Sequence, residues 1–245
     1  RDFCLSRGLG DVYKRQMLPP RLSDDLCSLR PDVVRLTKVC EMKFDKKGKM
    51  LHARFADAFI RSKARLTYQE AFTMLKGHDK GEVPSMVREA WKLASILRRN
   101  RYAKGALDLD FPEVRAVMDK DGRVTDIITE EYDESHQLIE ECMLAANEAV
   151  ALTLKNRNRP TIYRVHEEPD SAKLFEFGQL CKLYGHPVHD IGQRQYLNEL
   201  MKSIKGSPDE QLLKLALLKS LMRARYDTEP LGHYGLATAN YCHFT

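Results

Sequence analysis

The sequence predicts an α+β fold in which β-hairpins pack with several buried helices. Two observations point to this class: stretches of alternating apolar residues flank short polar turns, and longer stretches with helical spacing begin at capping residues. The hairpins and helices occur in groups along the chain and do not alternate strictly, which favours α+β.

Two hairpins are predicted from alternation and turn composition. Between residues 34 and 44 the even positions are mostly apolar, and a strand presents alternate residues to one face. Residues 45–49 (Asp-Lys-Lys-Gly-Lys) supply a turn, and alternation resumes over residues 51–59. The second hairpin turns at the Asp-Gly pair of residues 121–122, a dipeptide typical of tight hairpin turns.

Helices are predicted from their start and stop signals. The pairs Thr67/Glu70 and Ser207/Glu210 have capping-box spacing, which marks a helix start. The predicted helices cover residues 67–77, 84–103, 133–155, 171–184 and 207–226, and a short strand covers 161–166. The helices over 133–155 and 207–226 are apolar around so much of their circumference that we expect both in the interior.

Composition bounds the class of protein. The 245 residues are 43% hydrophobic and 31% charged, which is typical of a globular chain and excludes collagen-like and disordered sequences. The sequence contains no apolar run of about 18 residues and no secretory signal, so we expect neither a membrane partner nor export, and we expect a cytoplasmic location. The scattered cysteines and the lone pair His186/His189, which straddles a proline, predict no metal site.

The two ends of the sequence differ from the rest. Residues 1–16 show no apolar period and resemble a translated adapter or cloning remnant, so we expect the fold to begin at Met17 and to cover 17–245. Without 1–16 the charge balance is 36 basic against 33 acidic residues, or +3, because four of the 40 basic and two of the 35 acidic residues belong to that stretch. This small excess does not by itself indicate nucleic acid. We expect the chain to be truncated on both sides.

One carboxylate on the helix over 133–155 has two interpretations. Glu140 and Asn147 share a ridge opposite the apolar face, with apolar neighbours, while Glu141 and Glu148 form the neighbouring ridge. Either the Glu140 ridge is a solvated helix face, or the carboxylate reaches into a ligand channel. Spacing alone favours the first interpretation slightly.

Arg61, Lys63 and Arg65 form the most informative basic cluster. If the segment is extended, alternation places all three side chains on one side, which suits contact with a phosphate backbone. Two other clusters, near residues 98–104 and 155–159, lie at predicted helix ends, where cations are favoured in any case.

Four blocks of sequence resemble the catalytic module of the ribonuclease R and ribonuclease II family. They occur in the family's order and together span most of residues 17–245. The blocks are Leu-Pro-Pro-Arg-Leu-Ser-Asp-Asp-Leu-Cys-Ser-Leu at 18–29, Ile-Arg-Ser-Lys-Ala-Arg-Leu-Thr-Tyr at 60–68, Leu-Ile-Glu-Glu-Cys-Met-Leu-Ala-Ala-Asn at 138–147, and Gly-His-Tyr-Gly-Leu-Ala at 232–237 with Tyr-Cys-His-Phe-Thr at 241–245. The fold expected from this resemblance is an incomplete ribonuclease II-type catalytic domain.

The resemblance implies a hydrolytic, Mg²⁺-dependent exoribonuclease that degrades single-stranded RNA processively from the 3′ end and releases nucleoside 5′-monophosphates. It implies that Glu140 is the catalytic-site residue that contacts the ribose of the 3′-terminal nucleotide. The candidate RNA-binding residues are Arg61, Lys63, Arg65, Phe111, Asn147, Tyr241 and His243. The expected partner is single-stranded RNA, and we expect a monomer.

Three departures from the family pattern qualify this expectation. The family's Mg²⁺-binding aspartates lie upstream of the Leu-Pro block, where this chain has the foreign-looking stretch 1–16. A Ser-Pro-Ile-Arg-Arg-Tyr block with a catalytic arginine follows the last block in the family, and this chain stops before it. Near Leu109 the family has a base-stacking aromatic, for which Phe111 is the candidate substitute. We therefore expect the fragment to be inactive and to bind Mg²⁺ poorly, and we assign no metal ligand within it.

Two alternatives come from other classes of protein. One is a noncatalytic RNA-binding scaffold of the same fold that has lost the metal site. The other is a helical protein-interaction module, which predicts no salt-dependent binding to single-stranded RNA.

Overall fold

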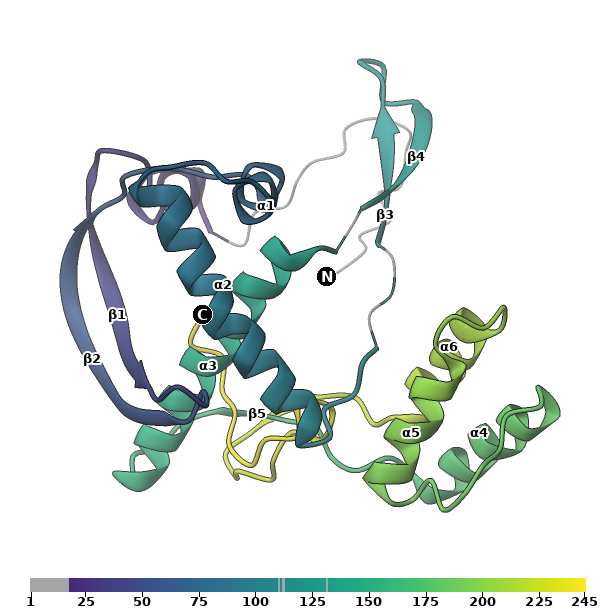
Figure 1. The fold of residues 1–245 in the computed structure, drawn as a ribbon. Helices are drawn as coiled ribbons and strands as arrows, with labels where there is room; N and C mark the ends of the chain where they lie inside the picture. The colour runs from purple at the N-terminus through teal and green to yellow at the C-terminus, as the bar shows by residue number, and fades with distance from the viewer. Residues whose placement is uncertain (1–17, 110, 112, 131) are drawn as a thin grey trace.

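The computed structural model describes residues 18–109, 111, 113–130 and 132–245 (Figure 1). The predicted boundary at residues 16–17 lies outside the described residues. The helices are α1 (Tyr68–Lys76), α2 (Glu82–Ala103), α3 (Glu134–Asn156), α4 (Ser171–Leu183), α5 (Arg194–Ile204) and α6 (Glu210–Ser220), with short helical turns η1 (Arg21–Leu26) and η2 (Tyr234–Leu236). The strands are β1 (Val34–Phe44), β2 (Met50–Arg61), β3 (Glu113–Met118), β4 (Val124–Glu130), β5 (Tyr163–Val165) and β6 (Arg225–Asp227).

The described strands form three separate two-stranded antiparallel sheets, β1–β2, β3–β4 and β5–β6. Both predicted hairpins are present, and the α+β class is confirmed. In the β1–β2 turn the Asp45 carboxylate accepts hydrogen bonds from the backbone N–H groups of Lys47 (2.8 Å) and Lys49 (2.9 Å). Gly48 completes this turn at φ +78°, a conformation that favours glycine.

The first three helices form one half of the molecule together with the β1–β2 hairpin. In Figure 1, α2 and α3 cross at the centre, and the hairpin curves along one side of them. The predicted capping box is present at α1, where the Thr67 N–H donates to Glu70 (2.7 Å) and the Glu70 N–H donates to the Thr67 hydroxyl (3.2 Å). Helix α2 begins at Glu82, two residues before the predicted start, so that Pro84 lies within its first turn, where no intrahelical N–H bond is lost.

The last three helices form a second cluster, which contains the larger hydrophobic core. Leu197, Ile204, Leu213 and Leu217 are all 0% exposed there. Helix α5 is absent from the sequence-based prediction. The prediction of one helix over 207–226 is wrong at both ends: α6 spans only Glu210–Ser220, and Arg225–Asp227 form β6, which pairs with β5.

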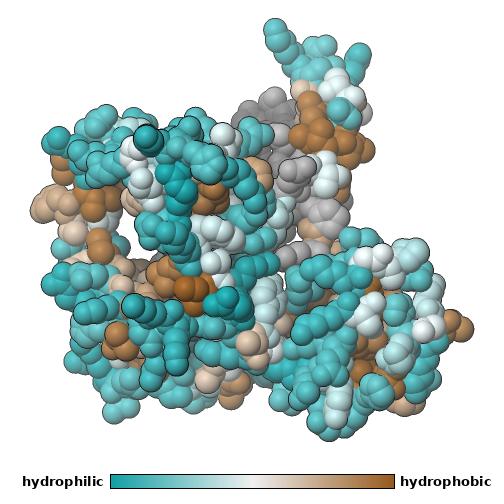
Figure 2. All heavy atoms as spheres, viewed as in Figure 1, coloured by the Kyte–Doolittle hydropathy of each residue, from teal (hydrophilic) through white to brown (hydrophobic). Residues whose placement is uncertain are grey.

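The two helices that we expected in the interior are less buried than their composition indicates. On α3, Ile139 and Met143 are 43% and 41% exposed, and on α6, Leu212 and Leu218 are 45% and 46% exposed. The β3–β4 hairpin projects away from both helix clusters and carries an apolar patch (Figures 1 and 2). Its most exposed apolar side chains are Val114, Met118, Val124 and Ile127.

Within the described part of the chain, none of the helices combines the length and the apolar character needed to cross a membrane.

Candidate functional site

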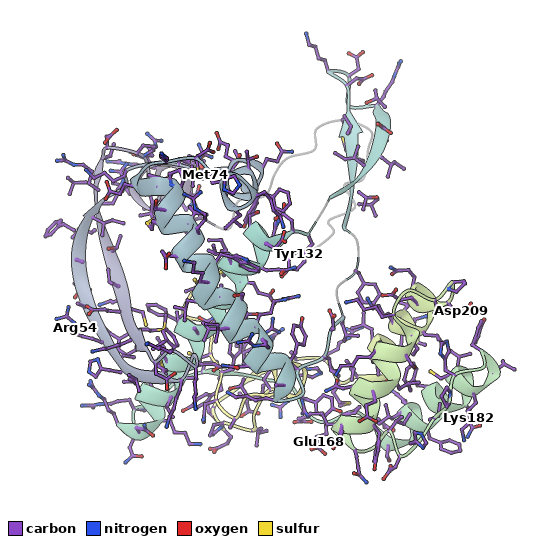
Figure 3. All side chains as sticks on the ribbon, in the orientation of Figure 1. Arg54, Met74, Tyr132, Glu168, Lys182 and Asp209 are labelled. Carbon is purple, nitrogen blue, oxygen red and sulfur yellow. The ribbon has the colours of Figure 1, made fainter. Side chains whose placement is uncertain are left out.

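Glu140 lies on α3, and three side chains bind its carboxylate. Arg98 Nη1 and Arg101 Nη2, both from α2, each lie 3.3 Å from one of its oxygens, and the Tyr132 hydroxyl donates a third hydrogen bond. Figure 3 shows Tyr132 at the N-terminal end of α3. The Glu140 side chain is 34% exposed, so it lies at the edge of the α2–α3 contact and not in bulk solvent.

Glu141, the next residue, is the buried member of the pair. Its side chain is 3% exposed, and its Oε1 atom accepts hydrogen bonds from Arg101 Nε (3.0 Å) and Nη2 (2.5 Å). Burial acts to lower the pKa of Arg101, but the hydrogen bond and charge of Glu141, with the charge of Glu140, raise that pKa above its ordinary value. Arg101 therefore stays charged and neutralises an almost fully buried carboxylate.

A cavity of about 570 Å³ lies beside this ion-paired cluster, between the β1–β2 turn, α2 and α3. Glu141 and Glu148, the ridge next to Glu140, line it together with Lys47 and Lys104. Burial raises the pKa of Glu148, against the opposing effect of the Lys104 charge. The carboxylates that border this cavity are thus on the ridge adjacent to the one that the sequence singled out.

Asn147 is 2% exposed and holds the C-terminal segment against α3. Its Oδ1 atom accepts hydrogen bonds from the backbone N–H groups of Phe244 (2.8 Å) and Thr245 (3.0 Å) and from the Thr245 hydroxyl (3.2 Å). Its Nδ2 atom donates to the Tyr241 hydroxyl at 3.1 Å. The side-chain hydrogen bonds of this candidate RNA-binding residue to other described residues are therefore with residues 241–245.

Tyr241 and His243 belong to a row of aromatic and histidine rings. Tyr241 is 8% exposed and contacts the edges of His233 (centroids 5.4 Å apart) and His243 (5.8 Å). His243 is exposed and hydrogen bonds to the Tyr226 hydroxyl (2.7 Å), and Arg164 lies 4.9 Å from the Tyr226 ring. Burial and the charge of Arg164 lower the pKa of His243 below its ordinary value. The row therefore ends in an exposed histidine beside a half-buried arginine.

The other candidate residues lie on different elements. Arg61 is the last residue of β2, the backbone bends at Lys63, and Arg65 follows in a loop; all three side chains are exposed. The extended segment that would place them on one side is therefore interrupted. Leu109 packs against the α4–α6 core, while Phe111 is half-buried.

Sequence reasoning missed Arg98, Arg101, Tyr132 and Glu141. The two arginines lie near the C-terminal end of a helix, where cations are favoured in any case. They also lie three residues apart on α2, a spacing that puts them on one ridge. Two cations on one ridge of a helix, together with the adjacent acids Glu140 and Glu141 on another, could have predicted ion pairs between the two helices.

No group of three or more His, Cys, Asp or Glu side chains within residues 18–109, 111, 113–130 and 132–245 is positioned to hold a metal ion. The acidic pair Glu140 and Glu141 is already bound by the two arginines of α2. The described residues therefore do not fit a resident Mg²⁺ ion.

The fold and the sequence define the class of protein. The RNB domain model matches residues 13–245, so this chain belongs to the RNB domain family. The resemblance inferred from the four sequence blocks is thereby confirmed.

Within this family, the chain is similar in sequence to proteins named Ribonuclease R. The chain is 37% identical to Ribonuclease R of Aquifex aeolicus over 237 residues, covering 94% of this chain and 34% of that protein. It is 33% identical to Ribonuclease R of Escherichia coli over 250 residues, covering 98% of this chain and 31% of that protein. The chain therefore spans about a third of the length of these relatives.

Solved structures with a similar fold include an RNase R. Mycoplasma genitalium RNase R in complex with ribose methylated single-stranded RNA matches with a TM-score of 0.87 and 29% identity, over 94% of this chain and 37% of that one. Yeast Ssd1, a pseudonuclease, matches with a TM-score of 0.69 at 19% identity, which shows a shared fold alone.

Proposed function

We propose that this chain is part of a hydrolytic exoribonuclease that degrades single-stranded RNA processively from its 3′ end and releases nucleoside 5′-monophosphates. The observation that carries the proposal is the RNB domain match over residues 13–245, supported by 37% identity to a Ribonuclease R. The relative solved with single-stranded RNA has the same fold over 94% of this chain, which supports RNA as the ligand. A cytoplasmic location and a monomeric state stay predictions.

In this proposal Glu140 contacts the ribose of the 3′-terminal nucleotide. A carboxylate can accept a hydrogen bond from a 2′-hydroxyl, which is the group that distinguishes RNA from DNA. Arg98 and Arg101 orient the oxygens of Glu140, and the Tyr132 hydroxyl donates a further hydrogen bond to the same carboxylate. Arg61, Lys63 and Arg65 are proposed to contact the phosphate backbone, with Phe111, Asn147, Tyr241 and His243 near the bound strand.

Hydrolysis in the parent protein is proposed to use Mg²⁺, which would stabilise charge on the attacking and leaving oxygens. Because the described residues of this chain do not fit the ion, its ligands would come from outside the described residues, and no catalytic step is assigned to Mg²⁺ here. We accordingly propose that the 245-residue chain alone is inactive.

Binding of a matched pair of oligonucleotides tests the role of Glu140. The two strands are uridine oligonucleotides that differ only in a ribose or a deoxyribose at the 3′-terminal position. We expect the chain to bind the ribose-ended strand more tightly, and we expect Glu140→Gln to remove this difference. Glu134→Gln, the same charge change on the same helix, should retain it. Equal affinities of the unchanged chain for both strands would contradict the role of Glu140.

A nuclease assay tests the activity itself. Residues 17–245 are transplanted into the corresponding segment of Aquifex aeolicus Ribonuclease R, and digestion of 5′-labelled single-stranded RNA is followed with Mg²⁺ present. We expect a ladder of products that shorten from the 3′ end, which Glu140→Ala suppresses, and no products from the 245-residue chain alone. A chimera that folds, binds RNA and cleaves none of it would favour the noncatalytic scaffold.

A further inference from the structure

A groove of about 580 Å³ lies between the β1–β2 hairpin, the C-terminal half of α3 and the C-terminal segment. Its lining includes Lys38, Arg157 and Arg159, the rings of Phe55 and Phe244, and the apolar side chain of Val150. None of the described residues that line it is acidic. The groove therefore combines three cations with two aromatic rings and attracts anions.

The two arginines are not needed to cap α3. The carbonyl oxygens of the last turn already accept backbone hydrogen bonds, from the N–H of Arg157 to Thr153 (3.1 Å), of Asn158 to Lys155 (3.0 Å) and of Arg159 to Leu154 (2.9 Å). Within the described part of the chain, neither Arg157 nor Arg159 has an acidic partner, and both side chains are exposed. Lys38 differs, because it pairs with Asp57 across the hairpin. The two guanidinium groups are therefore the free cations of the groove.

The aromatic pair is held in place by the fold. Phe55, on β2, and Phe244 meet edge to face, with centroids 6.4 Å apart and planes at 76°. The backbone N–H of Phe244 is fixed to buried Asn147 by a 2.8 Å hydrogen bond, and both rings are half-buried. Each ring thus contributes surface to the groove at little further cost in conformational entropy.

We propose that this groove binds an internal nucleotide of single-stranded RNA, with its phosphate at Arg157 and Arg159 and its base on Phe55 and Phe244. Basic side chains beside aromatic rings are the combination that binds single strands, because phosphates and base faces are both available. A duplex keeps its base faces stacked and does not match this groove.

The groove is distinct from the contact made by Glu140. Val150 follows Glu140 on α3 by ten residues, about 15 Å of helix. The inference rests on the proposed function, and it adds a second RNA contact that is insensitive to the 3′-terminal sugar.

The first experiment measures affinity and salt dependence. Binding of a fluorescein-labelled uridine oligonucleotide is followed by fluorescence anisotropy between about 50 and 200 mM salt. We expect Arg157→Gln with Arg159→Gln to weaken binding about tenfold or more and to reduce the slope of log K against log salt by about 0.7, the value for one lost phosphate contact on a single strand. The matched control, Lys120→Gln with Arg123→Gln on the exposed β3–β4 turn, should change neither.

The second experiment separates base stacking from charge. Phe244→Leu keeps an apolar side chain but removes the ring, and we expect it to weaken binding of the uridine strand about fivefold or more. Binding of an abasic ribose-phosphate strand of equal length should be unaffected by Phe244→Leu and still weakened by the arginine changes. Unchanged urea midpoints verify that each variant is folded.

The outcomes separate this inference from the proposed function. If the unchanged chain binds no single-stranded RNA, both are overturned. If it binds RNA with a preference for a 3′-terminal ribose, and the arginine variant has the same affinity and salt slope, the groove is overturned alone. A polyglutamate peptide that binds the groove with the same affinity as the uridine strand would also overturn the inference, because a peptide of acidic residues requires no aromatic surface.

Discussion

Arg101 on α2 donates two hydrogen bonds to a single oxygen of Glu141 on α3, at 3.0 Å from Nε and 2.5 Å from Nη2. Both side chains are almost fully removed from solvent, at 10% and 3% exposed. Because α2 and α3 cross at this point, the pair ties together the two central helices. It also fixes the guanidinium that reaches Glu140.

Loss of Arg101 should therefore destabilise the fold strongly. We expect Arg101→Met to lower the free energy of unfolding by about 3 kcal/mol or more, because it removes both hydrogen bonds to the buried Glu141 carboxylate and leaves only Arg98, at 3.8 Å, beside that charge. The double variant with Glu141→Leu should regain most of this loss, since the buried charge that lost its hydrogen bonds is gone. Urea unfolding of the single and double variants measures both values. A double variant as unstable as Arg101→Met would show that the buried charge is not the cause.

Gly48 and Gly122 offer a matched pair of substitutions. They occupy the turns of the two hairpins with nearly identical backbone conformations, at φ +78° and +77°. A Cβ atom on Gly48 would lie 2.7 Å from Ile96 Cγ2 and 2.9 Å from Asn100 Nδ2, while one on Gly122 would meet nothing within 4 Å. The first substitution therefore adds a collision to the strain that both share.

We expect Gly122→Ala to cost about 1 kcal/mol of stability, from backbone strain alone. Gly48→Ala should cost roughly 1 to 3 kcal/mol more, because α2 must give way or the turn must move off it. Chemical denaturation of both variants measures the difference. Equal losses would mean that the turn does not contact α2 in solution.

Asn147 and Tyr241 should show coupled effects. We expect Asn147→Leu to leave the part-buried N–H groups of Phe244 and Thr245 without their acceptor, at a cost of about 1 to 3 kcal/mol, and to abolish hydrogen-exchange protection of the Phe244 amide. Tyr241→Phe removes only the hydroxyl that accepts from Asn147. In a double-mutant cycle, a coupling energy of about 1 kcal/mol is expected, and strictly additive effects would contradict the contact.

Stability should fall as the pH drops below neutral because of His233. Burial, together with the charges of His166 and Arg164, lowers the pKa of His233 to about 4. The unfolded chain binds a proton on this ring near pH 6.5, whereas the folded chain does not. The contribution of His233 to the free energy of unfolding is therefore fully present above about pH 6.5 and is lost as the pH falls toward 4.

We expect a loss of about 2 kcal/mol from His233 between about pH 7 and 4, after allowance for its partial exposure. His233→Gln should reduce the slope of stability against pH in this range. Part of the slope should remain, because burial also lowers the pKa of His166. Urea midpoints measured across this pH range test the assignment, and an unchanged slope in the variant would refute it.

Elements with local signals were predictable from the sequence. The capping box at Thr67 and the Asp-Gly turn at 121–122 each require only neighbouring residues, and both are present in the structure. Helix α5 carries a usable signal that was missed, namely buried residues at helical spacing (Leu197, Leu200, Met201 and Ile204), but it lacks a side-chain cap to mark its start. Helix α6 was extended too far because apolar residues continue beyond Ser220.

The candidate site was predictable only in part. Glu140 was selected by its ridge and by family resemblance, whereas its partners Arg98 and Arg101 lie about 40 residues away, and no local pattern links them to it. The burial of Glu141 depends on how α2 crosses α3, which periodicity does not specify. The roles of the candidate RNA-binding residues stay predictions until binding is measured.

The bonds of Asn147 also have a consequence for synthesis of the protein. Its side-chain partners come from residues 241–245, the nearest of which is 94 residues later in the chain. At a translation rate of about 5 to 20 residues per second, roughly 5 to 20 s pass before they emerge from the ribosome. During that interval the Asn147 side chain lacks these hydrogen-bond partners. Helix α3 therefore acquires these contacts only after residues 241–245 have been made, well after its own residues.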